Sequence, residues 1–210
     1  MVTRQVSGEG GAARGPYKKS SATRERIIDA ATMIFGKHGY RNGSTTQIAA
    51  LAEVSSSQIF YYFPTKQAVL EAVLDRRDRL ADEVAGPALG DPREVPSAIL
   101  RIAAINESVP DFISLYSLLV AEATAREHPA HDYFRDRYRR LRVRFEAAFH
   151  DMEIAGLLAP GIDAAYAAAS TLAIWDGIQV QWLVEPESIS VVQCLRRHLS
   201  AITIVVEPVA

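Results

Sequence analysis

The sequence has almost no cysteine and no long apolar run. Cys194 is the single cysteine among 210 residues, which excludes a disulfide framework and a cysteine-rich zinc site. No uninterrupted apolar stretch approaches the roughly 20 residues that a bilayer-spanning helix needs. The first 22 residues also lack the apolar core of a secretion signal. These absences predict a cytoplasmic protein without a membrane partner.

Strand patterns, metal-ligand sets and catalytic motifs are missing as well. The β-branched run at 202–206 prolongs a helical pattern and has no partner strand, so we expect an all-α fold. His128 and His131 have a spacing that metal ligands use, but Pro129 lies between them and no nearby cysteine completes a set. We find no combination of nucleophile, base and electrophilic stabiliser. We therefore expect neither an enzyme nor a metal or other cofactor.

Charge is unevenly distributed along the chain. Residues 1–66 contain nine Lys or Arg and four Asp or Glu, a balance of +5. Residues 67–210 contain fourteen and twenty-one, a balance of −7. The basic part suits contact with a phosphate backbone, although a soluble surface with uneven charge explains the asymmetry equally well.

Two helix-start signals of the same kind stand eleven residues apart. They are Ser44-Thr45-Thr46-Gln47 and Ser55-Ser56-Ser57-Gln58. In each, the serine hydroxyl can accept a backbone N–H, and the glutamine three residues later can reach back to the serine N–H. Because so little chain separates the signals, they predict two short helices joined by a tight turn, which is the spacing of a helix-turn-helix.

Helical periodicity extends over most of the remaining chain. The first helix ends at Gly39, which suits a left-handed C-terminal cap. Pro64 ends the second of the two capped helices, and Thr65 can cap the next. We predict about nine helices, at 23–38, 45–52, 56–62, 65–85, 95–107, 111–127, 131–155, 163–184 and 188–205.

Three segments carry a resemblance to a known family. They are Phe35–Tyr40 (FGKHGY), Thr46–Ser55 (TQIAALAEVS) and Ile59–Lys66 (IFYYFPTK). Together they resemble the signature of TetR-type (TetR/AcrR) transcriptional regulators, and the similarity is close over residues 23–70. Three positions depart from the family pattern: Glu53 and Ser57 replace glycines, and Phe60 replaces a common tyrosine.

Residues 1–22 are rich in Gly, Ser and Ala with scattered Arg and Lys, so we expect a flexible basic arm there. The resemblance implies a three-helix helix-turn-helix DNA-binding domain at 23–66 and a helical ligand-binding and dimerisation domain at 67–210. The helix at 65–85 would connect the two domains. The helix at 56–62 would enter the major groove of a double-stranded DNA operator, where the Gln58 amide can pair with adenine. Gln58 can instead serve only as a capping partner, and Phe60 and Tyr62 can instead be packing residues. The candidate DNA-binding residues are Thr45, Thr46, Ser56, Gln58, Phe60, Tyr61, Tyr62 and Lys66.

In this family the larger C-terminal domain is the sensor. Its aromatic residues recur at helical spacing, which usually indicates core, yet a mostly apolar cavity with a few polar groups is also how small molecules are held. The candidate pocket residues are Phe112, Tyr116, Leu119, Glu122, Tyr138, Phe145, Trp175 and Gln179. Six arginines lie between Arg135 and Arg144, and we expect most of them outside because the apolar stripe of the same helix faces inward.

The last two predicted helices carry more apolar residues than two exposed helices need. The resemblance implies that they form a homodimer, which places two recognition helices about 34–36 Å apart, or a multiple, on a palindromic operator. Burial within one chain is the alternative. The candidate interface residues are Gly177, Ile178, Trp182, Val192, Leu195 and Leu199.

These features predict a homodimeric repressor that a small-molecule effector releases from its operator. An all-helical small-molecule carrier or interaction protein without operator binding is the alternative. Salt-dependent binding to upstream DNA separates the two, because phosphate contacts make affinity fall steeply with salt.

Overall fold

The computed structural model describes the backbone of residues 15–86 and 88–204, and the side chains from Ser20 onward. These residues form nine α-helices and one 3₁₀ helix without a strand, which confirms the expected all-α fold. None of the described helices is both long and apolar enough to cross a membrane. The α-helices are α1 (Gly15–Asn42), α2 (Thr45–Ala52), α3 (Ser56–Tyr62), α4 (Lys66–Ala85), α5 (Val95–Glu107), α6 (Pro110–Glu122), α7 (His131–Ile154), α8 (Ala164–Val184) and α9 (Val191–Ile202), and the 3₁₀ helix is η1 (Ala88–Gly90).

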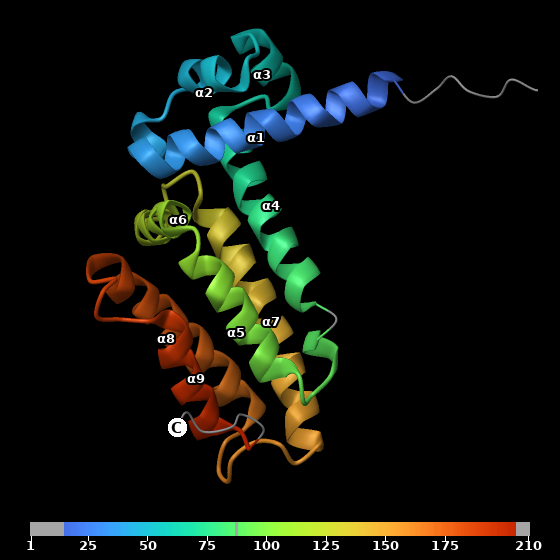
Figure 1. The fold of residues 1–210 in the computed structure, drawn as a ribbon, viewed down its shortest axis with the longest axis vertical. Coiled ribbons are helices and arrows are strands. Elements are labelled where there is room, and N and C mark those ends of the chain that lie inside the picture. The colour runs from blue at the N-terminus through green and yellow to red at the C-terminus, as the bar shows by residue number, and fades with distance from the viewer. Residues whose placement is uncertain (1–14, 87, 205–210) are drawn as a thin grey trace, which may run out of the picture.

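Helices α1, α2 and α3 form a head at one end of the molecule (Figure 1). Helix α1 lies crosswise over the other helices, whereas α4 and α5 run along the length of the molecule. The head has its own apolar core, because one face of each helix carries large apolar residues at helical spacing. Its fully buried members include Ile27, Ile28 and Phe35 of α1, Ile48 of α2 and Ile59 of α3.

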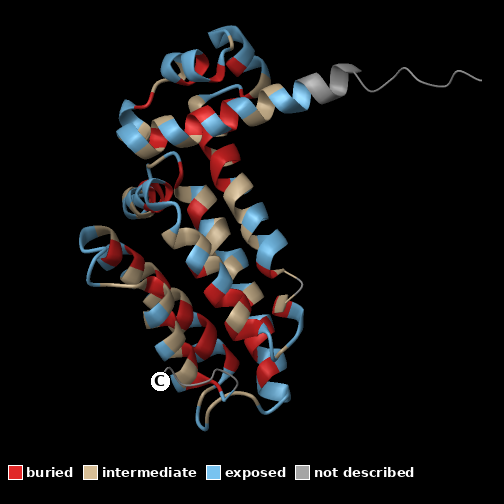
Figure 2. Cartoon of the chain, viewed as in Figure 1, coloured by how far each residue is buried: buried red, intermediate tan, exposed pale blue. Residues whose placement is uncertain are grey.

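Helices α4 to α9 form the body. Helix α8 packs against α7 and α9, and α5 packs against α4 and α9. Figure 2 shows that buried residues follow the facing sides of these helices while exposed residues follow the outside. The head is joined to the body in two places, since α1 packs against both α4 and α6.

Most helix boundaries agree with those predicted from the sequence, and the N-terminal segment is the main correction. Helix α1 begins at Gly15, eight residues before the predicted start at residue 23, so residues 15–22 are helical; residues 1–14 of the expected arm lie outside the described residues. Pro16 does not prevent this start, because the first-turn N–H groups of a helix have no helical partner. At the other end Gly39 has the expected positive φ of 73°, but the chain resumes helical geometry as far as Asn42.

Two body helices are shorter than predicted. Helix α6 ends at Glu122 because the following residues form turns, and the Thr124 hydroxyl donates to the Ala121 carbonyl at 2.8 Å. Helix α9 begins at Val191 because Ser190 caps it, its hydroxyl accepting the Gln193 N–H at 3.3 Å. Side chains that bond the backbone locally end helices in this way.

Candidate functional site

Both helix-start signals of the head form the bonds that the sequence predicts. The Ser44 hydroxyl accepts the Gln47 N–H at 3.2 Å, and the Ser44 N–H donates to the Gln47 amide oxygen at 2.8 Å. Ser55 and Gln58 form the same pair of bonds at 3.2 and 2.9 Å. Because these bonds satisfy N–H groups that a helix leaves open at its start, they fix where α2 and α3 begin.

The turn between α2 and α3 places a glutamate in left-handed geometry. Glu53 has φ 54° and ψ 48°, and its N–H donates to the Ala50 carbonyl at 3.4 Å. The Val54 N–H donates to the Ala49 carbonyl at 3.0 Å, which closes the end of α2. The turn therefore keeps its shape without the usual glycine, at a cost of about 1–2 kcal/mol.

The outer face of α3 is open to solvent. Tyr61 is 82% exposed and Phe60 is 49% exposed, whereas Tyr62 is half-buried with its ring edge-on to Tyr61. Two large aromatic rings on a short polar helix suit a groove in a partner molecule better than a core. Of the other expected DNA-binding positions, Thr46, Ser56 and Gln58 are exposed and Thr45 is half-buried.

Two of the expected DNA-binding residues already have partners inside the head. The Gln58 amide oxygen accepts the Ser55 N–H, so a bidentate contact with adenine requires that oxygen to leave the cap. The Lys66 ammonium donates to the Arg41 carbonyl at 3.1 Å and lies 4.6 Å from the centroid of the Tyr40 ring. Burial lowers the pKa of Lys66. A phosphate contact by Lys66 would therefore compete with its place against α1.

The body contains a cavity of about 450 Å³, which is the size of a small-molecule site. Helices α4 to α8 and η1 contribute to its wall, and its apolar lining includes Leu89, Ile102, Ile113, Leu141 and Leu172. Four further wall residues, Asp75, Arg79, Asp82 and Arg140, are exposed and come from α4 and α7. The cavity therefore opens to solvent between these two helices.

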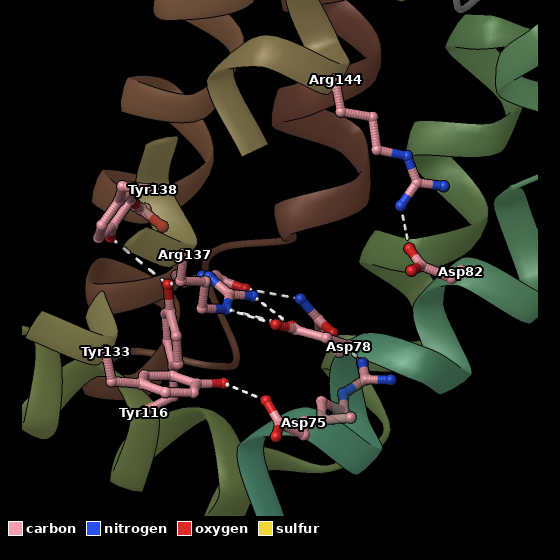
Figure 3. A network of polar contacts seen from close by, with 12 residues as sticks. Asp75, Asp78, Asp82, Tyr116, Tyr133, Arg137, Tyr138 and Arg144 are labelled. Carbon is pink, nitrogen blue, oxygen red and sulfur yellow. Dashed lines mark hydrogen bonds and ion pairs between the residues drawn. The ribbon is translucent and has the colours of Figure 1, made fainter. Parts of the chain in front are cut away.

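A chain of polar contacts crosses the cavity wall (Figure 3). The Arg137 guanidinium of α7 binds Asp78 of α4, with Nε–Oδ2 at 3.0 Å and Nη2–Oδ1 at 2.7 Å, and its Nη1 donates to the Tyr116 hydroxyl at 2.7 Å. The Tyr116 hydroxyl donates to that of Tyr138 at 3.4 Å, and Tyr138 donates to Asp176 at 2.7 Å. This chain joins helices α4, α6, α7 and α8.

Burial and neighbouring charge set the protonation of these groups. Burial opposes the charge of Arg137, yet Tyr116 and Asp78 raise its pKa above that of an ordinary arginine. Burial also raises the pKa of Tyr116, Tyr138 and Asp176, although in Asp176 the Tyr138 bond and the Arg137 charge oppose the rise. The tyrosines are therefore neutral hydrogen-bond donors around a charged arginine.

Helix α7 holds α4 at two further points. The Tyr133 hydroxyl donates to Asp75 at 3.2 Å, and Arg144 forms an ion pair with Asp82. We call the three pairs Asp75–Tyr133, Asp78–Arg137 and Asp82–Arg144 the α4–α7 clasp. Helix α4 packs closely on α1 and α5, whereas it reaches α7 mainly through these long side chains.

A second polar relay runs from α4 to α8. Arg77 donates to the Asn106 amide oxygen, and the Asn106 amide nitrogen donates to the Gln179 amide oxygen at 2.9 Å. The Arg77 guanidinium lies 5.9 Å from the centroid of the Phe112 ring and has no carboxylate partner among the described residues. All four of these residues line the cavity.

The structure places six of the eight expected pocket residues in the cavity wall: Phe112, Tyr116, Tyr138, Phe145, Trp175 and Gln179. Leu119 and Glu122 lie elsewhere, because α6 passes beyond the cavity toward α1. Leu119 is fully buried in the core, and Glu122 forms an ion pair with Arg41 of α1 at 3.2 Å.

Sequence reasoning missed the charged residues of the wall, above all Asp78 and Arg137. Four of the six arginines at 135–144 are exposed as expected, but Arg137 is largely buried. Its spacing carried a signal, since Arg137 is three residues after Phe134 and four before Leu141, on the inward stripe of α7. On α4 the matching signal is the recurrence of aspartate at positions 75, 78 and 82.

The expected interface residues fall into two groups. Trp182, Leu195 and Leu199 are buried within the single chain, as the alternative of intrachain burial anticipates. Gly177 is exposed, and Ile178 and Val192 are half-buried. Near Gly177, α8 also exposes the apolar side chains of Val180 and Val184, which are 50% and 82% exposed. The exposed apolar side chains of this region therefore lie on α8.

The head is a capped helix-turn-helix whose second helix is exposed, and the helical body contains a ligand-sized cavity. This combination defines a class of DNA-binding regulator. Comparison with known families agrees. Residues 27–73 match the family described as "Bacterial regulatory proteins, tetR family", and residues 95–203 match "BetI-type transcriptional repressor, C-terminal". The chain belongs to the TetR family, whose members are transcriptional regulators and not enzymes.

Similar proteins cover most of the chain. The HTH-type transcriptional regulator BetI of Rhizobium meliloti (strain 1021) is 26% identical over 174 residues, which are 80% of this chain and 81% of that protein. The structure of SmeT, repressor of the Stenotrophomonas maltophilia multidrug efflux pump SmeDEF, has a TM-score of 0.72 and 22% identity, covering 91% of this chain and 99% of SmeT. A transcriptional regulator from Saccharomonospora viridis, solved in complex with choline, has a TM-score of 0.71 and 25% identity, covering 87% and 98%.

Proposed function

We propose that this protein is a homodimeric transcriptional repressor that a small molecule in the body cavity releases from a palindromic operator. One observation carries the proposal. Helix α4 begins at Lys66, four residues after the end of α3, and the same helix supplies Arg77 and Asp78 to the cavity wall. A ligand that moves α4 would therefore move the DNA-reading helix.

On the DNA side, the exposed face of α3 enters the major groove. Ser56 and Gln58 contact base edges, because short polar and amide side chains can read the groove pattern. Thr45, Tyr61, Tyr62 and Lys66 contact the phosphate backbone and set register, and Thr46 contacts a base edge or a phosphate. Phe60 has no hydroxyl and makes only apolar contacts. The domain division follows from this role: residues 23–66 read DNA, and residues 67–210 sense the ligand and dimerise.

On the ligand side, the α4–α7 clasp is the element that a ligand disturbs. Its members Asp75, Asp82 and Arg144 line the cavity on the side where it opens between α4 and α7. A ligand must pass between these two helices. Separating α4 from α7 would change the distance between the two heads of a dimer. The choline complex of the S. viridis regulator supports a ligand-binding role for the body.

Dimerisation is the remaining part of the proposal. The apolar surface around Gly177, Val180 and Val184 of α8 is what a second copy would cover. A two-fold interface there places both heads on the same side of a duplex, as a palindromic operator requires.

Fluorescence anisotropy with a labelled duplex from the region upstream of the protein's own gene tests the proposal. We expect the protein to bind this duplex and affinity to fall steeply as salt rises, because phosphate contacts release counterions. Tyr61→Ala should weaken binding, since Tyr61 is 82% exposed and does not contribute to the core of the head. Val143→Ala is the matched control, because Val143 is also an exposed large side chain but lies on α7.

Two results would contradict the proposal. One is the absence of salt-dependent binding to any duplex from the native locus, which would favour the carrier alternative. The other is equal affinity of the Tyr61→Ala and Val143→Ala variants, which would remove α3 from the interface.

A further inference from the structure

The hydrogen-bond directions of the relay from Arg77 to Gln179 define the chemistry of the cavity. A guanidinium can only donate, so Asn106 must turn its oxygen toward Arg77. The Asn106 amide nitrogen then faces Gln179, which must in turn present its own oxygen. The Gln179 amide nitrogen and the other Arg77 N–H groups are left as donors. The two amide oxygens of the relay each already accept one hydrogen bond.

The pairing of the arginines in the cavity wall also indicates that Arg77 is available to a ligand. Arg137 is paired with Asp78 and Arg144 with Asp82, whereas Arg77 forms no ion pair among the described residues and contacts Asn106 and the ring of Phe112. The charges of Asp78 and Arg137 also act on Arg77, with opposite effects on its pKa. Desolvation opposes the charge of Arg77 and lowers its pKa. A half-buried guanidinium without a carboxylate partner among the described residues is unusual, because buried charges are normally paired.

Asp176 does not offer a comparable site for a cation. Its carboxylate already accepts the Tyr138 hydroxyl at 2.7 Å. Burial raises the pKa of Asp176, and the Tyr138 bond and the Arg137 charge oppose this rise. A cationic group placed there would also be repelled by Arg137.

A further donor lies in the same wall. The indole N–H of Trp175 is buried and has no hydrogen-bond partner in the described part of the chain. Trp175 and Gln179 are one helical turn apart on α8, so both belong to the same region of the cavity. Arg77, Gln179 and Trp175 therefore place three hydrogen-bond donors in one region of the wall.

We propose that the effector is an amphipathic carboxylate whose carboxyl group binds Arg77 and the Gln179 amide. Its apolar body occupies the cavity among Leu141, Phe145 and Leu172. A guanidinium and a carboxylate pair through two parallel hydrogen bonds, which fixes the orientation of the ligand. The proposal rests on the proposed function, since it names the ligand class of the same cavity.

Three probes with one apolar body test this assignment by isothermal titration calorimetry on the full chain. They are 4-phenylbutyrate, 4-phenylbutanol and (4-phenylbutyl)trimethylammonium. We expect the carboxylate to bind at least about tenfold more tightly than the other two, as a charged hydrogen bond in a partly buried site implies. Tighter binding of the ammonium, equal binding of the three, or no binding of any would each overturn the proposal.

Variants of Arg77 test whether this residue causes the preference for the carboxylate probe. Arg77→Gln should abolish the tenfold preference and leave 4-phenylbutanol binding within about twofold, whereas Arg77→Lys should retain part of the preference because it keeps the charge. Arg142→Gln is the control, since it removes the same charge from an exposed position of α7 outside the cavity wall. A full carboxylate preference in Arg77→Gln would overturn the assignment. Salt-dependent DNA binding without any probe tests the proposed function separately.

Discussion

Replacing Asp78 by alanine should reduce the free energy of unfolding by about 2–3 kcal/mol. Asp78 accepts three contacts from the Arg137 guanidinium, at 3.1, 3.0 and 2.7 Å, and the two side chains are only 28% and 15% exposed. Breaking a fully buried ion pair costs about 3–5 kcal/mol, because the remaining charge is left without a partner. We expect less here, since Arg137 keeps its bond to Tyr116 and lies beside a cavity that opens to solvent.

Urea unfolding followed by far-ultraviolet circular dichroism measures this loss. Protein concentration must be held constant, because the stability of the proposed dimer would depend on it. In thermal unfolding the same loss should lower Tm by about 4–12 °C in a chain of this size. The double variant Asp78→Leu with Arg137→Met should recover part of the stability, because it replaces the ion pair with apolar groups and leaves no unpaired charge.

The control is Asp132→Ala, which breaks an exposed pair of the same helix with Arg135. Exposed ion pairs contribute little, so this variant should unfold like the parent protein. If Asp78→Ala lost no more stability than Asp132→Ala, Arg137 would not depend on its partner. If the double variant were as unstable as Asp78→Ala, the loss would come from packing and not from an unpaired charge. Either result would refute the role of the pair in holding α4 to α7.

Three further predictions concern the head and the cavity. Glu53→Gly should raise the free energy of unfolding by up to about 1 kcal/mol, because glycine adopts the left-handed turn without strain; a loss in urea unfolding would contradict this. The raised pKa of Asp176 means that the folded state binds its proton more tightly than the unfolded state, so the carboxyl group destabilises the fold increasingly as pH rises above its ordinary pKa of 3.8. Asp176→Asn should therefore be more stable than the parent at pH 7, with a smaller difference near pH 4. Gln58→Ala should weaken operator binding more than Ser55→Ala, which removes the cap alone; equal anisotropy losses would show that Gln58 serves only as a capping partner.

The sequence predicted the head more accurately than the body, because the signals in the head are local. The capping boxes at Ser44 and Ser55 join residues three positions apart, and Pro64 ends α3 through its own backbone. Such interactions depend on no distant residue, so α2, α3 and α4 begin where the sequence indicates. The start of α1 was missed for the opposite reason, since residues 15–22 carry neither a cap signal nor an apolar stripe.

The cavity wall depended on contacts that no local pattern contains. Arg137 and Asp78 are 59 residues apart, and Arg77 and Asn106 are 29 apart. Helical spacing shows that Arg137 faces inward, but the rotation and register of α4 relative to α7 decide whether it meets a carboxylate. Glu122 shows the same limit, because its ion pair with Arg41 depends on how α1 crosses the end of α6. Aromatic residues were easier to place, since large apolar side chains on the inward face of a helix contact either the core or the cavity.

Two helices of the cavity wall, α4 and α6, connect the cavity to the head. Helix α4 runs directly from the wall to the helix-turn-helix, and α6 carries Phe112 and Tyr116 in the wall and contacts α1 through Glu122. A ligand shifts the balance between two conformations only by its difference in affinity for them, and a hundredfold loss of operator affinity corresponds to about 3 kcal/mol of coupling. That is similar in size to the loss that we expect when Asp78 is truncated. A ligand that bound the conformation with this pair open more tightly by about 3 kcal/mol would thus release the operator without any need to unfold the body.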